Sequence, residues 1–227
     1  MAEIRKLSAE DHALVTAAVR EAEQTTAAEI VTVVAERSDH YQDVPLLWAG
    51  GASLLVLSLL AAMPRLHLAV LDLLHAGWVH GTDAATAFLF AFLAAAVAFV
   101  LVWALLQWLP LRLVVTPRDY KIARTHRRAL DLFRVKVEGR TDGRNGVLIY
   151  LSLAEHRAEI VADAAVTRVI SPETWAEVMA EMLEIVGEGR IADGMAAAVR
   201  AAGRVLAPHF PRDARDENEL DDRLIEI

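Results

Sequence analysis

The residues of this sequence that could hold a metal ion are a few oxygen donors close to strand-like segments. Asp142 and Asn145 lie in a Gly-containing loop before the apolar run 147–153, and Asp163 follows the next run, 156–162. Glu29, the least favoured of the four, starts an earlier apolar run. Hard cations such as Ca²⁺ and Mg²⁺ need several converging oxygen ligands, which loops at strand ends can supply. We expect any metal site of the chain to use these four residues.

The same residues also have a purely structural interpretation. Asp142 and Asn145 are common turn residues, Asp163 could simply end a strand, and Glu29 could pair with a base at the surface. The residue types favour this structural interpretation, and a metal site remains the alternative.

Catalysis would require more than oxygen donors. Phosphoester hydrolysis needs a nucleophile or a metal-bound water, together with positive groups that bind phosphate. Arg140 and Arg144 could supply the positive charge, but the chain has no cysteine and no recognisable nucleophile signature. A non-enzymatic function is therefore preferred, with a divalent-metal-dependent phosphatase as the alternative.

Periodicity and turn signals indicate the elements that must position these residues. Ser8 resembles an N-cap, and the apolar spacing after it predicts a helix over 9–24. A run rich in β-branched residues predicts a buried strand over 29–35. Further on, the sequence predicts a helix over 117–133, with Thr116 as its cap, and a strand over 147–153. It also predicts a returning strand over 156–162 and helices over 172–186 and 191–206.

Between these elements, residues 45–111 read as a hairpin of two membrane crossings. Residues 46–63 carry no charge over 18 positions, and residues 84–111 carry none over 28, so each is long enough to span a bilayer as a helix. We place the crossings at about 46–63 and 86–110. The connector reads as an interfacial helix whose histidines, His67, His75 and His80, do not share one face as a set of metal ligands would.

Charge indicates which side of the membrane the flanks occupy. Residues 112–144, directly after the second crossing, carry ten basic and four acidic residues. The positive-inside rule places this flank in the cytosol. Contact with anionic lipid headgroups is favoured over nucleic-acid binding, because the basic block lies next to the membrane. No signal peptide is visible, so we expect a multi-pass protein of the inner membrane with both termini in the cytoplasm.

The segments outside the hairpin are predicted to form one domain. Residues 1–44 supply one helix and one apolar strand, which cannot bury that strand alone. The economical arrangement pairs 29–35 with 147–153 in one α/β sheet covered by helices. Residues 1–44 and 112–210 are then two parts of one cytosolic domain, residues 45–111 are an insertion, and residues 211–227 are a charged, acidic tail expected to be loosely attached.

Three segments resemble the TPM domain family. They are residues 26–34, residues 128–133, and residues 145–153 with the hairpin that follows, where Asn145, Gly146 and Val147 begin the most specific part. The resemblance covers about residues 8–36 and 118–207 and is closest to a bacterial branch whose domain is interrupted by membrane helices. It implies a compact α/β sandwich. For some members it also implies divalent metal binding, acid phosphatase activity, or a role in assembly or repair of membrane complexes.

The sequence departs from that family at the expected site. Arg144 stands where typical members carry a second Asn, and residues 163–166 replace a Gly-rich segment. We therefore expect the fold to be kept more readily than the site. The preferred function is a membrane-anchored interaction or assembly module, with membrane lipid and a membrane protein as partners, no nucleic acid, and a homo-oligomer left open.

Overall fold

The computed structural model describes residues 7–65, 69, 84–141, 143–213 and 218–227. The chain divides into two compact units, of which unit 1 comprises Met1–Asp39 and Arg118–Ile227, and unit 2 comprises His40–Pro117. Most of the expected connector, with its three histidines, lies outside the described residues, and so does Asp142.

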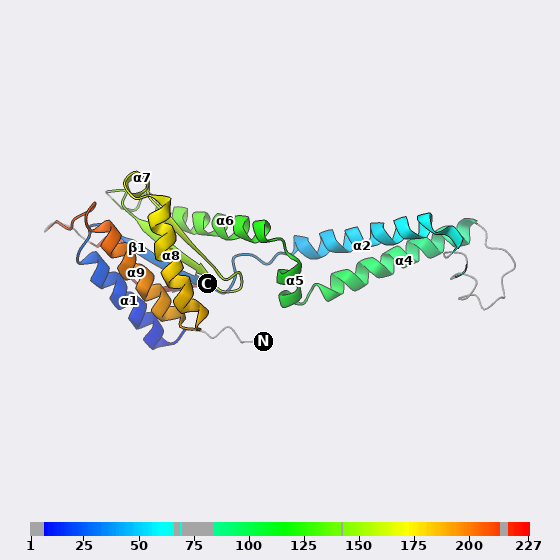
Figure 1. Ribbon diagram of the computed structural model, residues 1–227, viewed down its shortest axis with the longest axis horizontal. Coiled ribbons are helices and arrows are strands. Elements are labelled where there is room, and N and C mark those ends of the chain that lie inside the picture. The colour runs from blue at the N-terminus through cyan, green and yellow to red at the C-terminus, as the bar shows by residue number, and fades with distance from the viewer. Residues whose placement is uncertain (1–6, 66–68, 70–83, 142, 214–217) are drawn as a thin grey trace. The chain divides into compact units, whose positions relative to one another are not determined.

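Unit 1 is a four-stranded sheet with helices on both faces (Figure 1), and the order of its strands is β3-β2-β1-β4. The fold is therefore of the mixed α/β class that the sequence predicts. Its strands are β1 (Ile30–Ala35), β2 (Val147–Ser152), β3 (Arg157–Ala162) and β4 (Ile225–Glu226). Its helices are α1 (Ala9–Glu23), α6 (Arg118–Lys136), α7 (Ala164–Thr167), α8 (Pro172–Gly187) and α9 (Ile191–Leu206).

The centre of the sheet is a parallel pair formed by β1 and β2. Their register runs from Ile30 opposite Val147 to Ala35 opposite Ser152, and every residue of both strands is buried. Strands covered on both faces read as continuous apolar runs rather than as alternating patterns. The expected pairing across the hairpin insertion is therefore confirmed, and β3 returns antiparallel to β2, also as expected.

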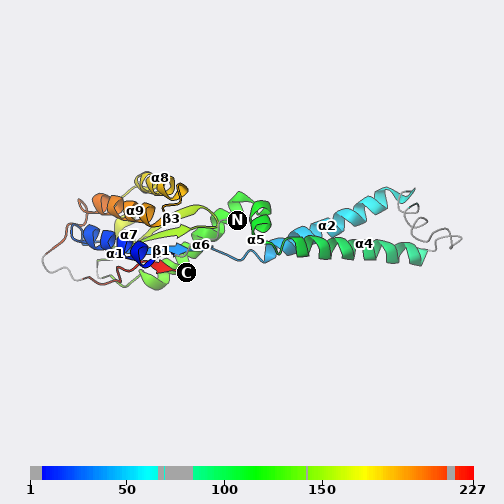
Figure 2. The ribbon, with the colours of Figure 1, turned by 90° about the horizontal axis from the view of Figure 1, so that it is seen from below.

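The two faces of the sheet are covered by different helices. Side chains of Ile30, Val34 and Ile149 face a core shared with α1, α8 and α9. Val33, Leu148 and Tyr150 face the other way, toward Ala129 and Phe133 of α6. Figures 1 and 2 show this arrangement, with α9 between α1 and α8. The sequence predicted these long helices, but it gave no sign of the short α7.

Small residues bring α1 and α9 close together. A Cβ atom added at Gly203 of α9 would lie 2.7 Å from the Cβ of Ala22 of α1. Such a contact is shorter than packed carbon atoms tolerate, so a larger residue there would force the two helices apart. At its other end α1 is held by a capping box, in which Ser8 and Asp11 satisfy each other's backbone N–H groups.

The C-terminal segment differs from its expected loose attachment. Ile225 and Glu226 pair with Val33 and Val34 of β1, and Leu224 is buried in the core. The backbone of Ile227 also donates to Val34 and accepts from Glu36, at 3.0 and 2.8 Å. An apolar strand such as β1 leaves an exposed edge unless something covers it. The expectation of a loose tail was therefore wrong for the last residues, because they provide that cover.

Unit 2 contains two long apolar helices, α2 (Asp43–Ala62) and α4 (Ala84–Leu105), and the short α5 (Leu109–Val115). The Ser53 hydroxyl of α2 donates to the Ala95 carbonyl of α4 at 3.0 Å, and Ala49 and Ala95 are buried. Gly50 and Gly51 of α2 have no atom within 4 Å of an added Cβ. The helix contact therefore uses the alanine and serine positions.

A buried arginine closes the base of this helix pair. The guanidinium of Arg112 donates to the carbonyl of Leu106 at 2.9 Å, to that of His40 at 2.7 Å, and to Gln107. Carbonyl groups past the end of a helix lack partners within the helix, so Arg112 satisfies those that follow α4. It also ties them to the backbone that precedes α2. The start of α2 and the end of α4 are thereby held together.

Candidate functional site

Residues on either side of the β2–β3 hairpin form a small polar cluster at one end of the sheet. The Gly146 N–H donates to the Asp163 carboxylate at 3.2 Å, and the Asp163 N–H donates to the Gly146 carbonyl at 2.9 Å. Asn145 precedes β2, and its side-chain amide donates to the Ala27 carbonyl. Asn145 and Asp163 are 8% and 7% exposed. The antiparallel pairing of β2 with β3 brings these residues together.

This cluster has features that suit a cation. In the described part of the chain, the Oδ1 atom of Asn145 is buried and accepts no hydrogen bond. Burial raises the pKa of the Asp163 carboxyl. The hydrogen bond from the Gly146 N–H and the positive charge of Arg144 act in the opposite direction and lower that pKa. A buried oxygen without a donor and a partly desolvated carboxylate both gain from a positive ligand. Asp163, Asn145 and neighbouring backbone carbonyls are the groups that would hold Ca²⁺ or Mg²⁺.

The structure brings two of the four predicted metal ligands close together. Asn145 and Asp163 lie together, whereas Asp142 lies outside the described residues. The Glu29 carboxylate accepts the N–H of Leu220 at 3.2 Å. Within the described ranges, no three His, Asp or Glu side chains are grouped as metal ligands. Metal binding by Asp142, Asn145, Asp163 and Glu29 stays a prediction.

Glu29 belongs to a second cluster, of three buried carboxylates. Glu23 ends α1 and accepts the Ile30 N–H at 3.0 Å, and Asp222 accepts from Arg20 at 2.9 Å. Burial raises the pKa of Glu23 to about 8, and the charges of Glu29 and Asp222 add to this effect. The three side chains come from α1, the start of β1 and the C-terminal segment. This cluster therefore links the end of α1 to the segment that covers β1.

Sequence reasoning missed several of these positions. Glu23 looked like an ordinary surface residue at the end of a helix, and Asp222 lay in the segment expected to be loose. Gly146 does carry a visible signal, because it follows Asn145 just before the strand. A Cβ at Gly146 would lie 2.2 Å from the side chain of Val137, so only glycine fits there. Packing thus requires glycine at position 146, whether or not a metal binds.

A buried polar network occupies the opposite end of β1 and β2. The Ser38 hydroxyl contacts the Tyr150 hydroxyl at 3.0 Å, and the Ser38 N–H donates to Glu155 at 3.1 Å. Ser152 also donates to Glu155. Burial raises the pKa of Tyr150. Ser152 is fully buried, so its hydroxyl cannot reach a substrate, and the network serves to fix residue 38 where the chain leaves the sheet.

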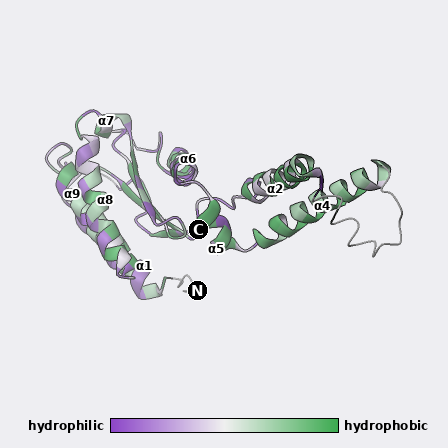
Figure 3. Cartoon of the chain, turned by 45° about the vertical axis from the view of Figure 1, so that its right-hand side comes forward, coloured by the Kyte–Doolittle hydropathy of each residue, from purple (hydrophilic) through white to green (hydrophobic). Residues whose placement is uncertain are grey.

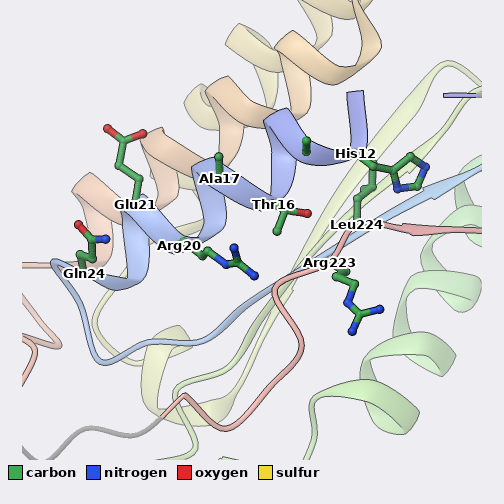
Figure 4. A pocket seen from close by; sticks show the side chains of 9 residues that line it. His12, Thr16, Ala17, Arg20, Glu21, Gln24, Arg223 and Leu224 are labelled. Atoms are coloured by element: carbon green, nitrogen blue, oxygen red, sulfur yellow. The ribbon is translucent and has the colours of Figure 1, made fainter. Parts of the chain in front are cut away.

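A shallow groove of about 720 Å³ lies between α1 and the C-terminal segment. Figure 4 shows Thr16 and Arg20 of α1 facing Arg223 and Leu224 across it. Arg20 pairs with Asp222 and Arg223 with Asp221, so their charges are already balanced. The groove contains no residue of the Asn145 and Asp163 cluster, and we assign no chemistry to it.

Comparisons with known proteins show a family similarity over the second half of the chain. The family model of the TPM domain matches residues 111–205. Residues 111–205 are therefore similar to the TPM domain. The match runs from before α6 to the last turn of α9, and so covers Asn145, Gly146 and Asp163. The first part of unit 1, with α1 and β1, precedes the matched residues.

One solved structure supports the fold. The NMR structure of the BA42 protein from the psychrophilic bacterium Bizionia argentinensis matches at a TM-score of 0.57 and 18% identity, covering 100% of both chains. At this identity the likeness concerns the fold alone. No curated protein matches the chain.

Replacement of Glu23 by Gln should change how stability depends on pH. The pKa of Glu23 is raised in the folded protein, so its stabilising contribution is complete below pH 4.5 and is lost as the pH rises toward about 8. Across that window the free energy of unfolding should fall by up to about 1.4 kcal/mol per pH unit on account of this group. Glu23→Gln keeps an acceptor for the Ile30 N–H but does not titrate.

Denaturant unfolding of the purified full chain between pH 5 and 8 measures this effect. The difference between wild type and Glu23→Gln should grow in favour of the variant as the pH rises. Glu10→Gln is the matched control, because Glu10 is exposed on the same helix. Parallel pH profiles of wild type and Glu23→Gln would show that Glu23 ionises normally in the folded protein.

Proposed function

We propose that this chain is an integral membrane protein whose TPM domain is a cytosolic interaction or assembly module. The observation that carries the proposal is the parallel pairing of β1, which precedes α2, with β2, which follows α4. A sheet built from both flanks of a membrane insertion needs both flanks on one side. Two crossings meet that requirement.

The surfaces of α2 and α4 support membrane insertion. Both helices are long and apolar enough to cross a bilayer, with 20 and 22 residues. Figure 3 shows both as apolar along their length. Most of their large side chains would face water in a soluble protein, at a high cost in free energy. Those at least half exposed include Leu46, Leu47, Trp48, Leu54, Leu55, Leu59, Phe88, Leu89, Phe92, Leu93 and Leu101.

The basic flank and the polar clusters support the rest of the proposal. Arg118, Lys121 and Arg124 follow α5 directly, which the positive-inside rule associates with the cytosolic side. Among the described residues, the buried Ser152 is an unsuitable nucleophile, and the arginines of the groove are paired. We therefore propose that the domain binds a membrane-protein partner rather than transforming a substrate.

Affinity capture from gently solubilised membranes tests this function. The tagged full chain should recover a membrane protein reproducibly in several mild detergents. The matched control is Gly203→Val, which should separate α1 from α9 and leave the sequence of α2 and α4 unchanged, so it should lose the partner. Recovery of the wild-type chain alone in every detergent would contradict the proposal, and so would equal recovery by the Gly203→Val chain.

A divalent-metal-dependent phosphatase is the second candidate, favoured by the unpartnered Oδ1 atom of buried Asn145 beside Asp163. A bound metal ion would supply an activated water and a positive charge for phosphate. The residues of this chain would hold the ion through Asp163 and Asn145, and Arg144 could orient a phosphoester.

Thermal unfolding with and without millimolar Ca²⁺ or Mg²⁺ tests this alternative. Binding at 100 times the dissociation constant would stabilise the fold by about 2.7 kcal/mol, an effect that Asp163→Asn should abolish. Asp193→Asn, at an exposed site of α9, is the control. A chain that shows neither metal-dependent stabilisation nor phosphoester turnover that depends on Asp163 would eliminate the metal site and the enzyme together.

A further inference from the structure

Positive charge in this chain is concentrated on one helix. α6 carries seven basic residues and two acidic ones. The chain holds 23 basic and 31 acidic residues, so all other segments together have 16 basic and 29 acidic residues. A single cationic helix on an otherwise acidic domain is suited to an anionic surface.

Packing fixes which face of α6 is available. Thr125, Ala129 and Phe133 are buried, and the latter two contact the sheet core through one side of the helix. Residues three and four apart share a helix face, so the opposite side carries positions 120, 124, 127, 131 and 134. We call these five positions the outer face of α6. Arg127, Asp131 and Arg134 on it are exposed, as are its neighbours Arg128 and Val135.

The outer face of α6 and its neighbours Arg128 and Val135 combine positive charge with aromatic and apolar contact. Across the described residues, Arg127 and Arg128 have no carboxylate within salt-bridge distance, and Arg134 has only an exposed contact with Asp131 at 3.7 Å. The Arg124 guanidinium lies over the Tyr120 ring, 4.8 Å from its centroid, and also pairs with Asp39 at 2.9 Å. Val135 is 61% exposed. Arginine with tyrosine and a nearby apolar side chain is a composition suited to the headgroup region of a bilayer.

We propose that the outer face of α6 is a docking surface for anionic phospholipid headgroups of the membrane that holds α2 and α4. The proposal rests on the proposed membrane anchoring and adds the lipid class and the helix face. Each basic side chain near an anionic bilayer contributes about fivefold to binding, and salt screens this attraction. In an anionic membrane the TPM domain lies with α6 against the lipid, while α8 and α9, on the other face of the sheet, stay in water.

The absence of cysteine from the chain makes a direct test practical. The full chain with Ala123→Cys, at an exposed position of α6, is labelled with an environment-sensitive fluorophore and placed in lipid nanodiscs. Ala180→Cys, at an exposed position of α8, is the matched control. Quenching by neutral acrylamide is compared between phosphatidylcholine discs and discs that also contain phosphatidylglycerol.

We expect phosphatidylglycerol to protect the label at position 123 from quenching, to leave position 180 unchanged, and to lose its effect at high salt. Arg127→Glu with Arg128→Glu should lower the ratio of docked to undocked protein by about 25-fold or more, at fivefold for each side chain. Reversal of the exposed Arg168 and Arg204, which lie outside α6, should leave the protection in place.

Equal quenching in both kinds of disc would overturn the proposal. Protection by added duplex RNA but not by phosphatidylglycerol would also overturn it, in favour of nucleic-acid binding. The anchoring is read separately, as retention of the chain in the discs during washing at alkaline pH. Retention without lipid-dependent protection refutes only the docking of α6, whereas release of the chain refutes the membrane anchoring.

Discussion

The structure depends on the pairing of two strands that are separated by more than one hundred residues. β1 and β2 lie side by side in parallel, and both are buried on both faces, so neither could stay in water alone. The chain leaves the sheet after β1, forms two apolar helices and returns to the sheet as β2, which pairs with β1. The hairpin is therefore an insertion within a domain, and its two ends must come back together.

Specific contacts at the ends of the insertion and at the edge of the sheet allow the domain to form around the inserted helices. Arg112 binds the carbonyls of Leu106 and His40, so the end of α4 is tied to the chain that precedes α2. Within unit 1, Ser38 and Asp39 are tied to Thr125 and Arg124 of α6, so the outgoing and incoming segments also meet. The free edge of β1 is covered by the last residues of the chain. Polar contacts thus fix the ends of the segments that leave and re-enter the sheet, because apolar contacts alone specify position less precisely.

Much of the fold could be predicted from the sequence, because long apolar patterns identify α1, β1, α6, β2, α8 and α9. The pairing of β1 with β2 also followed, since neither strand could be buried otherwise. The C-terminal strand could not be predicted, because Ile225 and Glu226 form too short a pattern and depend on the edge of β1. At the candidate site, the proximity of Asn145 and Asp163 was foreseeable from the strand hairpin. The carboxylates of Glu23 and Asp222 were not, because only tertiary packing buries them.

The central proposal is that one sheet is assembled from both flanks of a membrane hairpin, and that both flanks lie on the cytosolic side. The most direct measurement is labelling of single cysteines by a membrane-impermeant maleimide in intact cells and in inverted membrane vesicles. Ala13→Cys reports on α1, before the hairpin, and Ala176→Cys reports on α8, after it. Both should react only in inverted vesicles. Reaction of the two positions from opposite sides of the membrane would contradict the account, because one sheet cannot form from chains on both sides.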